Sequence, residues 1–417
     1  MEIGSNRDNL KTILHLDMNS YFASVEQQAN PYLQGRPVGI IKAEGRGCII
    51  AASVEAKKSG VRTGSTVWEA RKLCPAIILV PSDTDKYFSQ TEKMIRIVSS
   101  YSPIVEVFSI DEVFADVTQT QKLFPGGIVE MVFRIKKDIS MSLGEWVKCS
   151  VGVSFNKLAA KLGSEMNKPD GLTFLTKENY LTETETVNVK EVCGIGHSRS
   201  KLLYGRGIFN LGQARKADLP REISDLVWLR GSDSLVTNEV LERAKSVSRT
   251  YTTFANLETE EKVEKLIRNL VEEAVEKLRQ MGMSGRTLCL FLRSDTGNFW
   301  TRKTLSSPTH DGYLLFRLLW QEYKRNPLLP VRFAGVSLSN LALDIQPTVI
   351  PEIQKRETAM KYVDTINAKW GEFTVYPAIL LGGELIRPEV TGFLGDKWYR
   401  FGGLERTRTS TPKGIRS

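Results

Sequence analysis

The sequence is poor in the residues that build disulfide frameworks and zinc sites. Its 417 residues include five cysteines and three histidines. The cysteines are odd in number, and no two of them have the C-x-x-C spacing of a metal or redox motif. These features argue against a disulfide scaffold or a zinc site and fit a reducing compartment.

Long apolar stretches are also missing. No uninterrupted apolar run reaches the roughly 18 residues expected of a membrane helix. The N-terminal segment MEIGSNRDNLKTIL has neither the apolar core nor the small-residue cleavage site of a signal peptide. We therefore expect a cytoplasmic protein with no membrane contact.

Positive charge is what the sequence has in excess, with 57 Lys and Arg against 48 Asp and Glu and a net charge of +9. Clustered basic side chains bind polyanions by releasing counterions, so a nucleic-acid partner is one reading and a solvated basic surface is the other. Hydrophobic residues make up 41% of the chain and charged residues 25%, as in globular proteins. At ~100–200 residues per domain, the length fits two to four domains.

Strand and helix patterns alternate in the first part of the chain. The segment TILHLDMN has the composition of a short buried strand that ends near Asp17, and a helical segment follows it. IVEVFSIDEVFADVT is rich in β-branched and aromatic residues, which indicates strand structure. Residues 87–101 and 128–142 have amphipathic helical spacing. We predict an α+β sheet domain with helices packed behind the strands.

Three carboxylates interrupt apolar strands in this domain: Asp17, Asp111 and Glu112. Burial of a carboxylate is costly unless a cation compensates it. Two Mg²⁺ ions about 3.5–4 Å apart can stabilise the attacking and leaving oxygens of phosphoryl transfer. On a regular strand Asp111 and Glu112 point to opposite faces, so both reach one site only if the strand turns or bulges there. The alternative is that they are edge charges in a hairpin.

Five segments of the chain resemble motifs of the Y-family translesion DNA polymerases, the DNA polymerase IV group most closely. The resemblance runs from about residue 12 to residue 346. The matching segments are DMNSYFASVE (17–26), AASVEAKKSGVRTG (51–64), VEVFSIDEVFADVT (105–118), SVGVSFNKLAAKLGSEMNKPDG (150–171) and CGIGHSRSKLLYGRGI (193–208). The resemblance implies template-directed, low-fidelity translesion synthesis, in which a primer 3′-hydroxyl attacks a dNTP and pyrophosphate leaves.

The resemblance also implies an α+β, right-hand polymerase with palm, fingers, a helical thumb containing a helix-hairpin-helix, and an α+β little finger. The expected boundaries are palm 10–27 and 82–171, fingers 28–81, thumb 172–240, a basic linker 241–250, little finger 251–346 and a C-terminal extension 347–417. We expect the end of this extension, beyond Gly402, to be disordered.

The family's metal ligands correspond to Asp17, the backbone carbonyl of Met18, Asp111 and Glu112. Together they would hold two Mg²⁺ ions. Glu112 would serve the ion that activates the primer 3′-hydroxyl.

Several further positions correspond to the family's nucleotide contacts. Phe22 falls at the steric gate, where an aromatic ring occupies the space that a ribose 2′-hydroxyl would need. Its neighbour Tyr21 is also assigned to the substrate site, and Lys168 corresponds to a lysine that contacts the triphosphate. For Phe22, the alternative from the sequence is a plain core aromatic.

The fingers motif departs from the family's frequent pattern of Tyr and, three residues later, Arg. This chain has Val54 and Lys57 instead. Lys57 keeps the charge of Arg without its two-pronged hydrogen bonding, so we expect it to contact phosphate, and we assign no role to Val54. Lys161 is interpreted as a solvated helix charge.

A glycine turn at Gly194 and Gly196 resembles the hairpin of a helix-hairpin-helix. Such glycines let the backbone approach a phosphate, and helix N–H groups favour an anion. The alternative is an ordinary turn. Basic residues at which the resemblance implies contact with the DNA backbone are Lys201, Lys245, Arg249 and Arg302.

Two other functions remain to be weighed. A DNA-binding scaffold without activity would not need the three carboxylates. A nucleotidyl cyclase would not need a steric gate or a DNA-binding glycine turn. The expected partners are primer-template DNA and dNTP. We find no convincing clamp-binding peptide after residue 346, which leaves sliding-clamp binding open, and we expect a monomer.

Overall fold

The computed structural model describes residues 11–43, 46–236, 244–343, 351–371 and 373–382. It divides into two compact units, Met1–Leu241 and Glu242–Ser417. Within the described ranges, no helix is both long and apolar enough to cross a membrane. The segment beyond Gly402, which we expected to be disordered, lies outside these ranges.

A five-stranded sheet is the centre of the first unit, and its order is β5-β6-β1-β7-β8. Its strands are β1 Ile13–Met18, β5 Val105–Val107, β6 Glu112–Asp116, β7 Cys149–Ser154 and β8 Leu172–Leu175. The central strand β1 runs antiparallel to both β6 and β7. All six residues of β1 are buried. The predicted α+β sheet domain is therefore confirmed.

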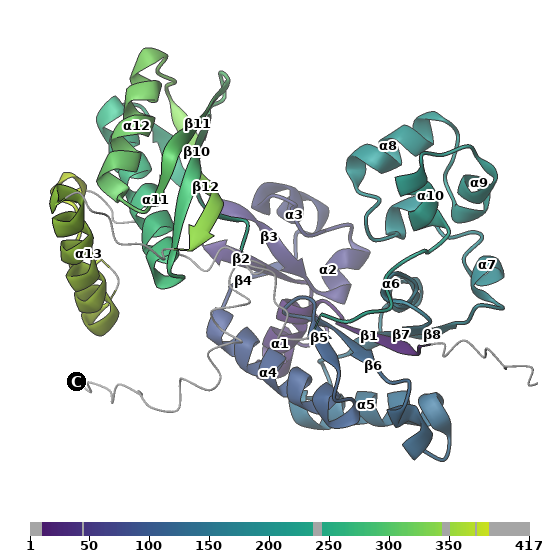
Figure 1. Ribbon diagram of the computed structural model, residues 1–417. Helices are drawn as coiled ribbons and strands as arrows, with labels where there is room; N and C mark the ends of the chain where they lie inside the picture. Colours follow the sequence, from purple (N-terminus) through teal and green to yellow (C-terminus); the bar gives the residue numbers. More distant parts are fainter. Residues whose placement is uncertain (1–10, 44–45, 237–243, 344–350, 372, 383–417) are drawn as a thin grey trace, which may run out of the picture. The chain divides into compact units, whose positions relative to one another are not determined.

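Helices cover both faces of this sheet (Figure 1). Helices α4 (Thr84–Tyr101) and α5 (Gly127–Leu143) pack against each other on one side, and α6 (Lys157–Met166) lies on the other. The predicted helices at 87–101 and 128–142 are thus confirmed. Helix α4 begins earlier than predicted because the Asp83 side chain caps it by accepting from the Lys86 backbone N–H.

The face of β1 that is turned toward α6 carries His15 and Asp17. His15 contacts Ser164 of α6, and Asp17 forms an ion pair with Lys168, just beyond the end of α6. The helix lies very close to β7, because a Cβ atom added at Gly152 would lie 2.0 Å from the carbonyl oxygen of Ala160. Glycine at position 152 therefore sets the distance between α6 and the sheet.

A smaller sheet follows β1 and α1 (Tyr21–Ala29) in the chain, after the 3-10 turn Pro31–Leu33. Its order is β3-β2-β4. It consists of β2 Val38–Ala43, β3 Arg46–Ala52 and β4 Ile78–Pro81, with helices α2 Val54–Lys58 and α3 Val67–Leu73. Thr66 and Glu69 form a reciprocal capping box at the start of α3.

A group of short helices follows β8 and packs on α6. These elements are α7 Tyr180–Glu183, the 3-10 turn Val189–Glu191, α8 His197–Gly205, α9 Leu211–Lys216 and α10 Arg221–Val227. Leu162 of α6 shares an apolar core with Ile195, Leu203 and Val227. The sequence predicted a helix before the glycine turn, but the structure has only the single 3-10 turn there.

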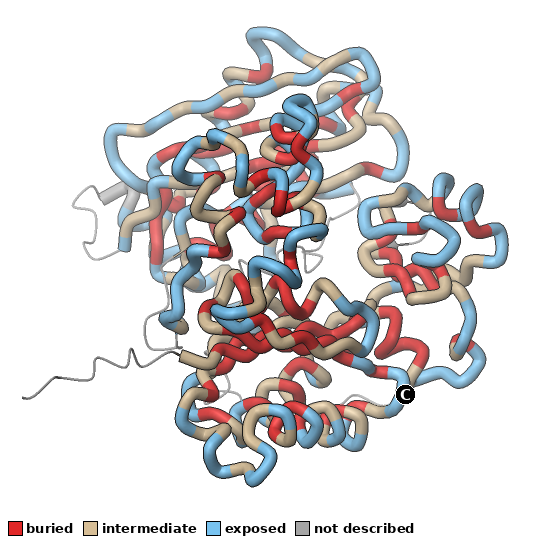
Figure 2. The backbone as a smooth tube through the Cα atoms, turned by 90° about the vertical axis from the view of Figure 1, so that its right-hand side faces the viewer, coloured by how far each residue is buried: buried red, intermediate tan, exposed pale blue. Residues whose placement is uncertain are grey.

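The second unit has an antiparallel sheet of order β11-β10-β12-β9 with two long helices on one face. Its elements are β9 Ser246–Leu257, α11 Glu260–Gln280, β10 Met283–Arg293, β11 Asn298–Thr309, α12 Gly312–Arg325 and β12 Val331–Leu343. The buried residues of this unit lie mainly in α11, β10 and β12, whereas no residue of β11 is buried. Figure 2 colours the chain by the burial of each residue. The expected linker at 241–250 is shorter than predicted, because the residues from Ser246 onward already pair with β12.

The C-terminal extension contributes helix α13 (Pro351–Trp370) and a 3-10 turn, Ala378–Leu380, to the second unit. The Arg279 side chain in α11 makes two hydrogen bonds to Asp364 of α13, 2.6 and 2.8 Å long. Leu380 is buried, and its 3-10 turn contacts α11. The part of the extension that the structure describes is therefore packed against the second unit.

Candidate active site

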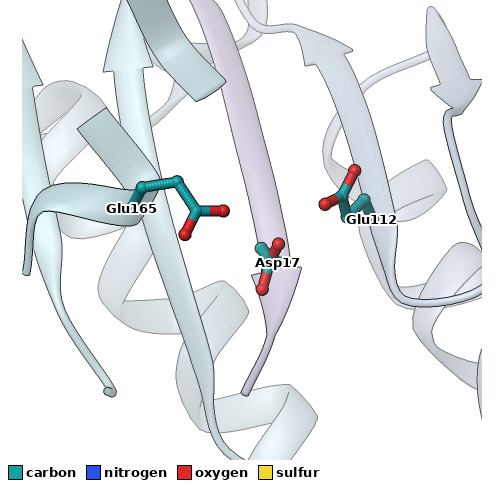
Figure 3. Close-up of side chains that lie close together, drawn as sticks. All are labelled: Asp17, Glu112 and Glu165. Atoms are coloured by element: carbon teal, nitrogen blue, oxygen red, sulfur yellow. The ribbon is translucent and has the colours of Figure 1, made fainter. Parts of the chain in front are cut away.

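Two carboxylates meet where β1 and β6 lie side by side. Asp17 and Glu112 are direct partners in the strand register, and Glu165 reaches the same place from α6 (Figure 3). One oxygen from each of the three lies within 4.8 Å of the others. Asp17 is only 5% exposed. Three converging carboxylates fit a hard cation such as Mg²⁺, which prefers oxygen ligands.

The chain turns between β5 and β6, as a shared site for Asp111 and Glu112 requires. The N–H groups of Phe108 and Ser109 both donate to the Glu112 carbonyl oxygen. Asp111 therefore lies in the turn, where its carbonyl oxygen accepts from the Met18 N–H at 2.9 Å. The Asp111 carboxylate accepts from the Ser109 hydroxyl. It is not part of the three-carboxylate group, so its role as a metal ligand, like that of the Met18 carbonyl, stays a prediction.

Burial dominates the electrostatics of the carboxylates. It raises the pKa of Asp17, and the positive charge of Lys168 only partly opposes this effect. Burial also raises the pKa of Asp111. Burial acts in the same direction on Glu112, but Asp17 and the Lys161 ammonium hold the pKa of Glu112 below its ordinary value. Without a metal ion, Asp17 is therefore the one of these two partners that takes up a proton more readily as the pH falls.

Two lysines compensate the carboxylates. The Lys168 ammonium lies 2.7 Å from Asp17 Oδ1 and 2.8 Å from Glu165 Oε1. The Lys161 ammonium lies 2.6 Å from Glu112 Oε1, with its side chain 16% exposed. The interpretation of Lys161 as a solvated charge is therefore wrong. A signal was present in the sequence, since Lys161 and Glu165 are four residues apart and so share one face of α6.

His15 is a site residue that the sequence prediction missed. It is fully buried, and its Nδ1 lies 2.7 Å from the Ser164 hydroxyl. Its Nε2 lies 3.9 Å from Glu112 Oε2. Burial lowers the pKa of His15 to about 4, so the ring is neutral at neutral pH. The available signal was its place two residues before Asp17, which puts both side chains on one face of β1.

The two predicted aromatic contacts have different surroundings. The ring of Phe22 stacks on Tyr87 of α4, with centroids 4.3 Å apart and planes 11° apart. Phe22 is half-buried. Tyr21 is buried, and its hydroxyl donates to the Tyr87 carbonyl oxygen and also bonds to Thr91. The Tyr21 side chain joins α1 to α4 rather than offering a group to substrate, which corrects its assignment to the substrate site.

Lys57 lies in α2 with an exposed side chain. Nearby protein atoms and the positive charge of Lys168 lower its pKa, while Asp17 and Glu165 act in the opposite direction. The positive charges of Lys57 and Lys168, both predicted to contact a triphosphate, therefore repel each other. The carboxylates of Asp17 and Glu165 attract the Lys57 ammonium.

The predicted DNA contacts differ in accessibility. Gly194 has a φ of +97°, and Gly196 precedes α8 without a side-chain cap. Lys201, Lys245 and Arg302 are exposed. The Arg249 side chain is much less accessible to DNA, because it is only 17% exposed and its Nε lies 3.8 Å from Glu273 Oε2.

Arg249 points inward because of its position in the strand register. It lies directly opposite Val336, which is buried in the core under α11. Directly opposed residues on antiparallel strands share a face. The structure therefore corrects the assignment of Arg249 to the DNA-binding surface.

Comparison with known proteins gives the same family over both units. The impB/mucB/samB family matches residues 16–165, and the impB/mucB/samB family C-terminal domain matches residues 244–349. DNA polymerase IV of Pelotomaculum thermopropionicum is 34% identical over 386 residues, covering 88% of this chain and 95% of the relative. DNA polymerase IV of Moorella thermoacetica is 32% identical over 397 residues, covering 89% and 96%.

The fold also has a solved counterpart. A Y-family DNA polymerase chimera aligns with a TM-score of 0.67 and 22% sequence identity, covering 80% of this chain and 99% of that chain. At 22% identity, this structural similarity is evidence for the fold alone. Together with the family matches and the identity to curated relatives, it shows that the chain belongs to the impB/mucB/samB family of Y-family DNA polymerases, in the DNA polymerase IV group.

Proposed function

We propose that this protein is a DNA-directed DNA polymerase that performs low-fidelity translesion synthesis. It would extend a primer by attack of the 3′-hydroxyl on the α-phosphate of a dNTP, releasing pyrophosphate. The observation that carries the proposal is the convergence of Asp17, Glu112 and Glu165 where β1 and β6 lie side by side in a buried sheet, in a chain 34% identical to a curated DNA polymerase IV.

The carboxylates would hold two Mg²⁺ ions. Asp17, Glu112, Asp111 and the Met18 carbonyl are the proposed ligands. When bound, the ions supply activation of the primer 3′-hydroxyl and neutralisation of charge on the transferring phosphate. Asp111, whose carboxylate accepts a hydrogen bond from the Ser109 hydroxyl, would supply a further oxygen ligand. Glu165 lies within the same group and is a further candidate ligand.

Nucleotide selection and binding would depend on residues around the carboxylates. Phe22, held against Tyr87, would exclude a ribose 2′-hydroxyl. Lys57 and Lys168 would bind the triphosphate as compact positive charges. Lys168 now pairs with Asp17 and Glu165, so it would exchange these partners for phosphate oxygens when the nucleotide arrives with its metal ion.

Primer-template DNA would be held through its phosphates. The turn at Gly194 and Gly196 offers backbone N–H groups at the start of α8, and Lys201 is exposed on that helix. Lys245 and Arg302 would add contacts from the second unit. Such contacts fix the position of the DNA without reading its sequence. We propose a cytoplasmic protein that works as a monomer.

Primer extension in Mg²⁺ on an undamaged and an abasic template tests this function. We expect the native chain to extend both and Asp111→Asn to lose more than about 100-fold in rate, the upper end of losses from residues one step further from a metal. Glu106→Gln is the matched control, because Glu106 lies in the same hairpin but pairs with Lys157. Glu165→Gln, measured in parallel, tests whether Glu165 is also a ligand.

The same assay separates the alternatives. A native chain that binds primed DNA but never extends it would be a DNA-binding scaffold. Formation of a cyclic nucleotide without extension would indicate a cyclase. Equal activity of Asp111→Asn and the native chain would remove Asp111 from the ligand set.

A further inference from the structure

Helix α6 carries two lysines that pair with acids of the β5–β6 hairpin. Lys157 Nζ lies 2.7 Å from Glu106 Oε2, and Lys161 Nζ lies 2.6 Å from Glu112 Oε1. The two pairs are alike in length and in burial, with all four side chains 11–19% exposed. They differ in place, because only Glu112 belongs to the three-carboxylate group.

The Lys161 ammonium is fixed from several sides. It lies 5.2 Å from the centre of the Phe108 ring, within cation–π range. The backbone of the same residue is also held, because its carbonyl oxygen accepts a 2.7 Å hydrogen bond from the Ser164 hydroxyl. Gly152 brings this stretch of α6 into contact with the sheet, since an added Cβ would lie 2.4 Å from the Ser164 nitrogen.

The Ser164 hydroxyl also determines which nitrogen of His15 carries the proton. A hydroxyl has one proton, and the 2.7 Å contact with the Lys161 carbonyl oxygen requires it. His15 Nδ1, 2.7 Å away, must then donate to Ser164. The neutral ring therefore has no proton on Nε2, the atom that faces Glu112. His15 therefore contacts α6 through Ser164 and donates no hydrogen bond to the Glu112 carboxylate. Lys161 is the group that holds this carboxylate in place.

We propose that Lys161 is a positioning residue for catalysis: its ammonium fixes one carboxylate oxygen of Glu112 and leaves the other to the catalytic metal ion. This inference rests on the proposed metal site. The same charge neutralises Glu112 before a metal ion binds. Lys161 therefore opposes cation binding in the free protein while it orients Glu112 for the reaction.

These two effects have opposite signs, which gives the proposal a distinctive signature. Loss of the ammonium removes a nearby positive charge, so the DNA-free protein should bind a divalent cation more tightly. Loss of the same ammonium frees Glu112 to rotate, so turnover at saturating Mg²⁺ should fall by roughly 10–100-fold, as for other groups that orient metal ligands. A residue that merely stabilises the fold would not produce both changes.

The experiment compares Lys161→Met and Lys161→Arg with Lys157→Met in the full chain. Mn²⁺ binding to the DNA-free protein is measured by electron paramagnetic resonance, and kcat is measured by primer extension at saturating Mg²⁺. We expect Lys161→Met to bind Mn²⁺ several-fold more tightly with a lowered kcat, and Lys161→Arg to recover most of both native values. Lys157→Met should leave both unchanged, because Glu106 keeps a hydrogen bond from the Val236 N–H.

Thermal unfolding shows whether each variant is folded, and Lys161→Gln replaces the Met variant if that one is not. If the Lys161 variant matches Lys157→Met in both measurements, the proposal is wrong. It is also wrong if Mn²⁺ binding weakens together with kcat and Arg restores neither. A native chain that never extends primers refutes the proposed function instead, and the Mn²⁺ measurement then still tests whether Lys161 opposes a cation at Glu112.

Discussion

At the residue scale, the site is a set of buried charges that are balanced before any cation binds. Asp17 is matched by Lys168, and Glu112 by Lys161. A buried carboxylate left without a partner would be strongly destabilising, so these lysines allow the two carboxylates to remain buried in the folded protein. In the proposed reaction, Lys168 would leave Asp17 for the phosphates of the nucleotide, whereas Lys161 would stay on Glu112.

The Phe22 ring provides a test at the same scale. Replacing it by Ala in Phe22→Ala removes the surface that Tyr87 supports by stacking. We expect ribonucleotide insertion, relative to deoxyribonucleotide insertion, to rise by at least about tenfold, which corresponds to relief of a clash of only ~1.4 kcal/mol. Single-nucleotide insertion kinetics with matched ribo- and deoxyribonucleotides measure this ratio.

Tyr21→Phe is the control for Phe22. It removes a hydroxyl that is bonded to Tyr87 and Thr91, and it leaves the adjacent ring in place. Sugar selectivity should not change in this variant. Unchanged selectivity in Phe22→Ala would refute the steric-gate assignment.

At the element scale, the position of α6 decides which side chains meet at the site. Helix α6 supplies Lys161, Ser164 and Glu165, and Lys168 follows it. Its close approach to β7 depends on the absence of a side chain at Gly152. Protein interiors are packed densely enough that even one added methyl group is felt.

We therefore expect Gly152→Ala to destabilise the protein by about 1–3 kcal/mol, the usual cost of overpacking, and to reduce polymerase activity by displacing α6. Urea unfolding and primer extension measure the two effects. Gly205→Ala is the matched control, because nothing lies within 4 Å of a Cβ at this position in α8. Native stability in Gly152→Ala would show that α6 can move away without cost.

A second prediction at this scale concerns strand β11. Arg302 lies opposite Cys289, and its neighbour Lys303 lies opposite Leu288, a core residue under the helices. The two side chains therefore leave the sheet on opposite faces. Arg302 is exposed beside Trp300, which is 64% exposed, whereas Lys303 lies 3.4 Å from Glu322 of α12.

The face of this sheet opposite α11 and α12 carries Arg302. If this face binds DNA phosphates, Arg302→Ala should weaken binding of primed DNA and lower the slope of log affinity against log salt concentration by about 1. Lys303→Ala should leave the slope unchanged. Fluorescence anisotropy over a range of salt concentrations provides the measurement. Equal effects of the two substitutions would place the DNA elsewhere.

At the scale of the whole molecule, the described C-terminal extension is part of the second unit. Arg279 is 8% exposed at its side chain and depends on Asp364 of α13 for its paired hydrogen bonds. We expect Asp364→Ala to destabilise this unit by about 2 kcal/mol, the order of a lost hydrogen bond to a charged group. Urea unfolding of the full chain, followed by tryptophan fluorescence, measures the change.

Arg356→Ala is a control on the same helix. Its guanidinium lies 3.3 Å from Asp311 but is 57% exposed, so the loss should stay below about 1 kcal/mol. If Asp364→Ala were as stable as Arg356→Ala, α13 would not contribute to the stability of the unit through this ion pair.

The sequence determined the features that local pattern encodes. Strand and helix periodicity predicted the α+β sheet and helices α4 and α5, and the apolar surroundings of Asp17 and Glu112 indicated a charged site. The resemblance to the polymerase motifs gave the family, which the comparisons confirm over both units. Each of these signals depends on neighbours in the chain, so a single sequence was sufficient.

Only the tertiary structure decided which distant side chains meet. Glu165, Lys161 and His15 joined the site because α6 packs on β1 and β7, and Arg249 turned inward because of its register with Val336. Helix and strand patterns show that a residue lies on a given face of its own element. What that face contacts depends on how elements far apart in the sequence pack, and for α6 this is decided by close contact at a single glycine, Gly152.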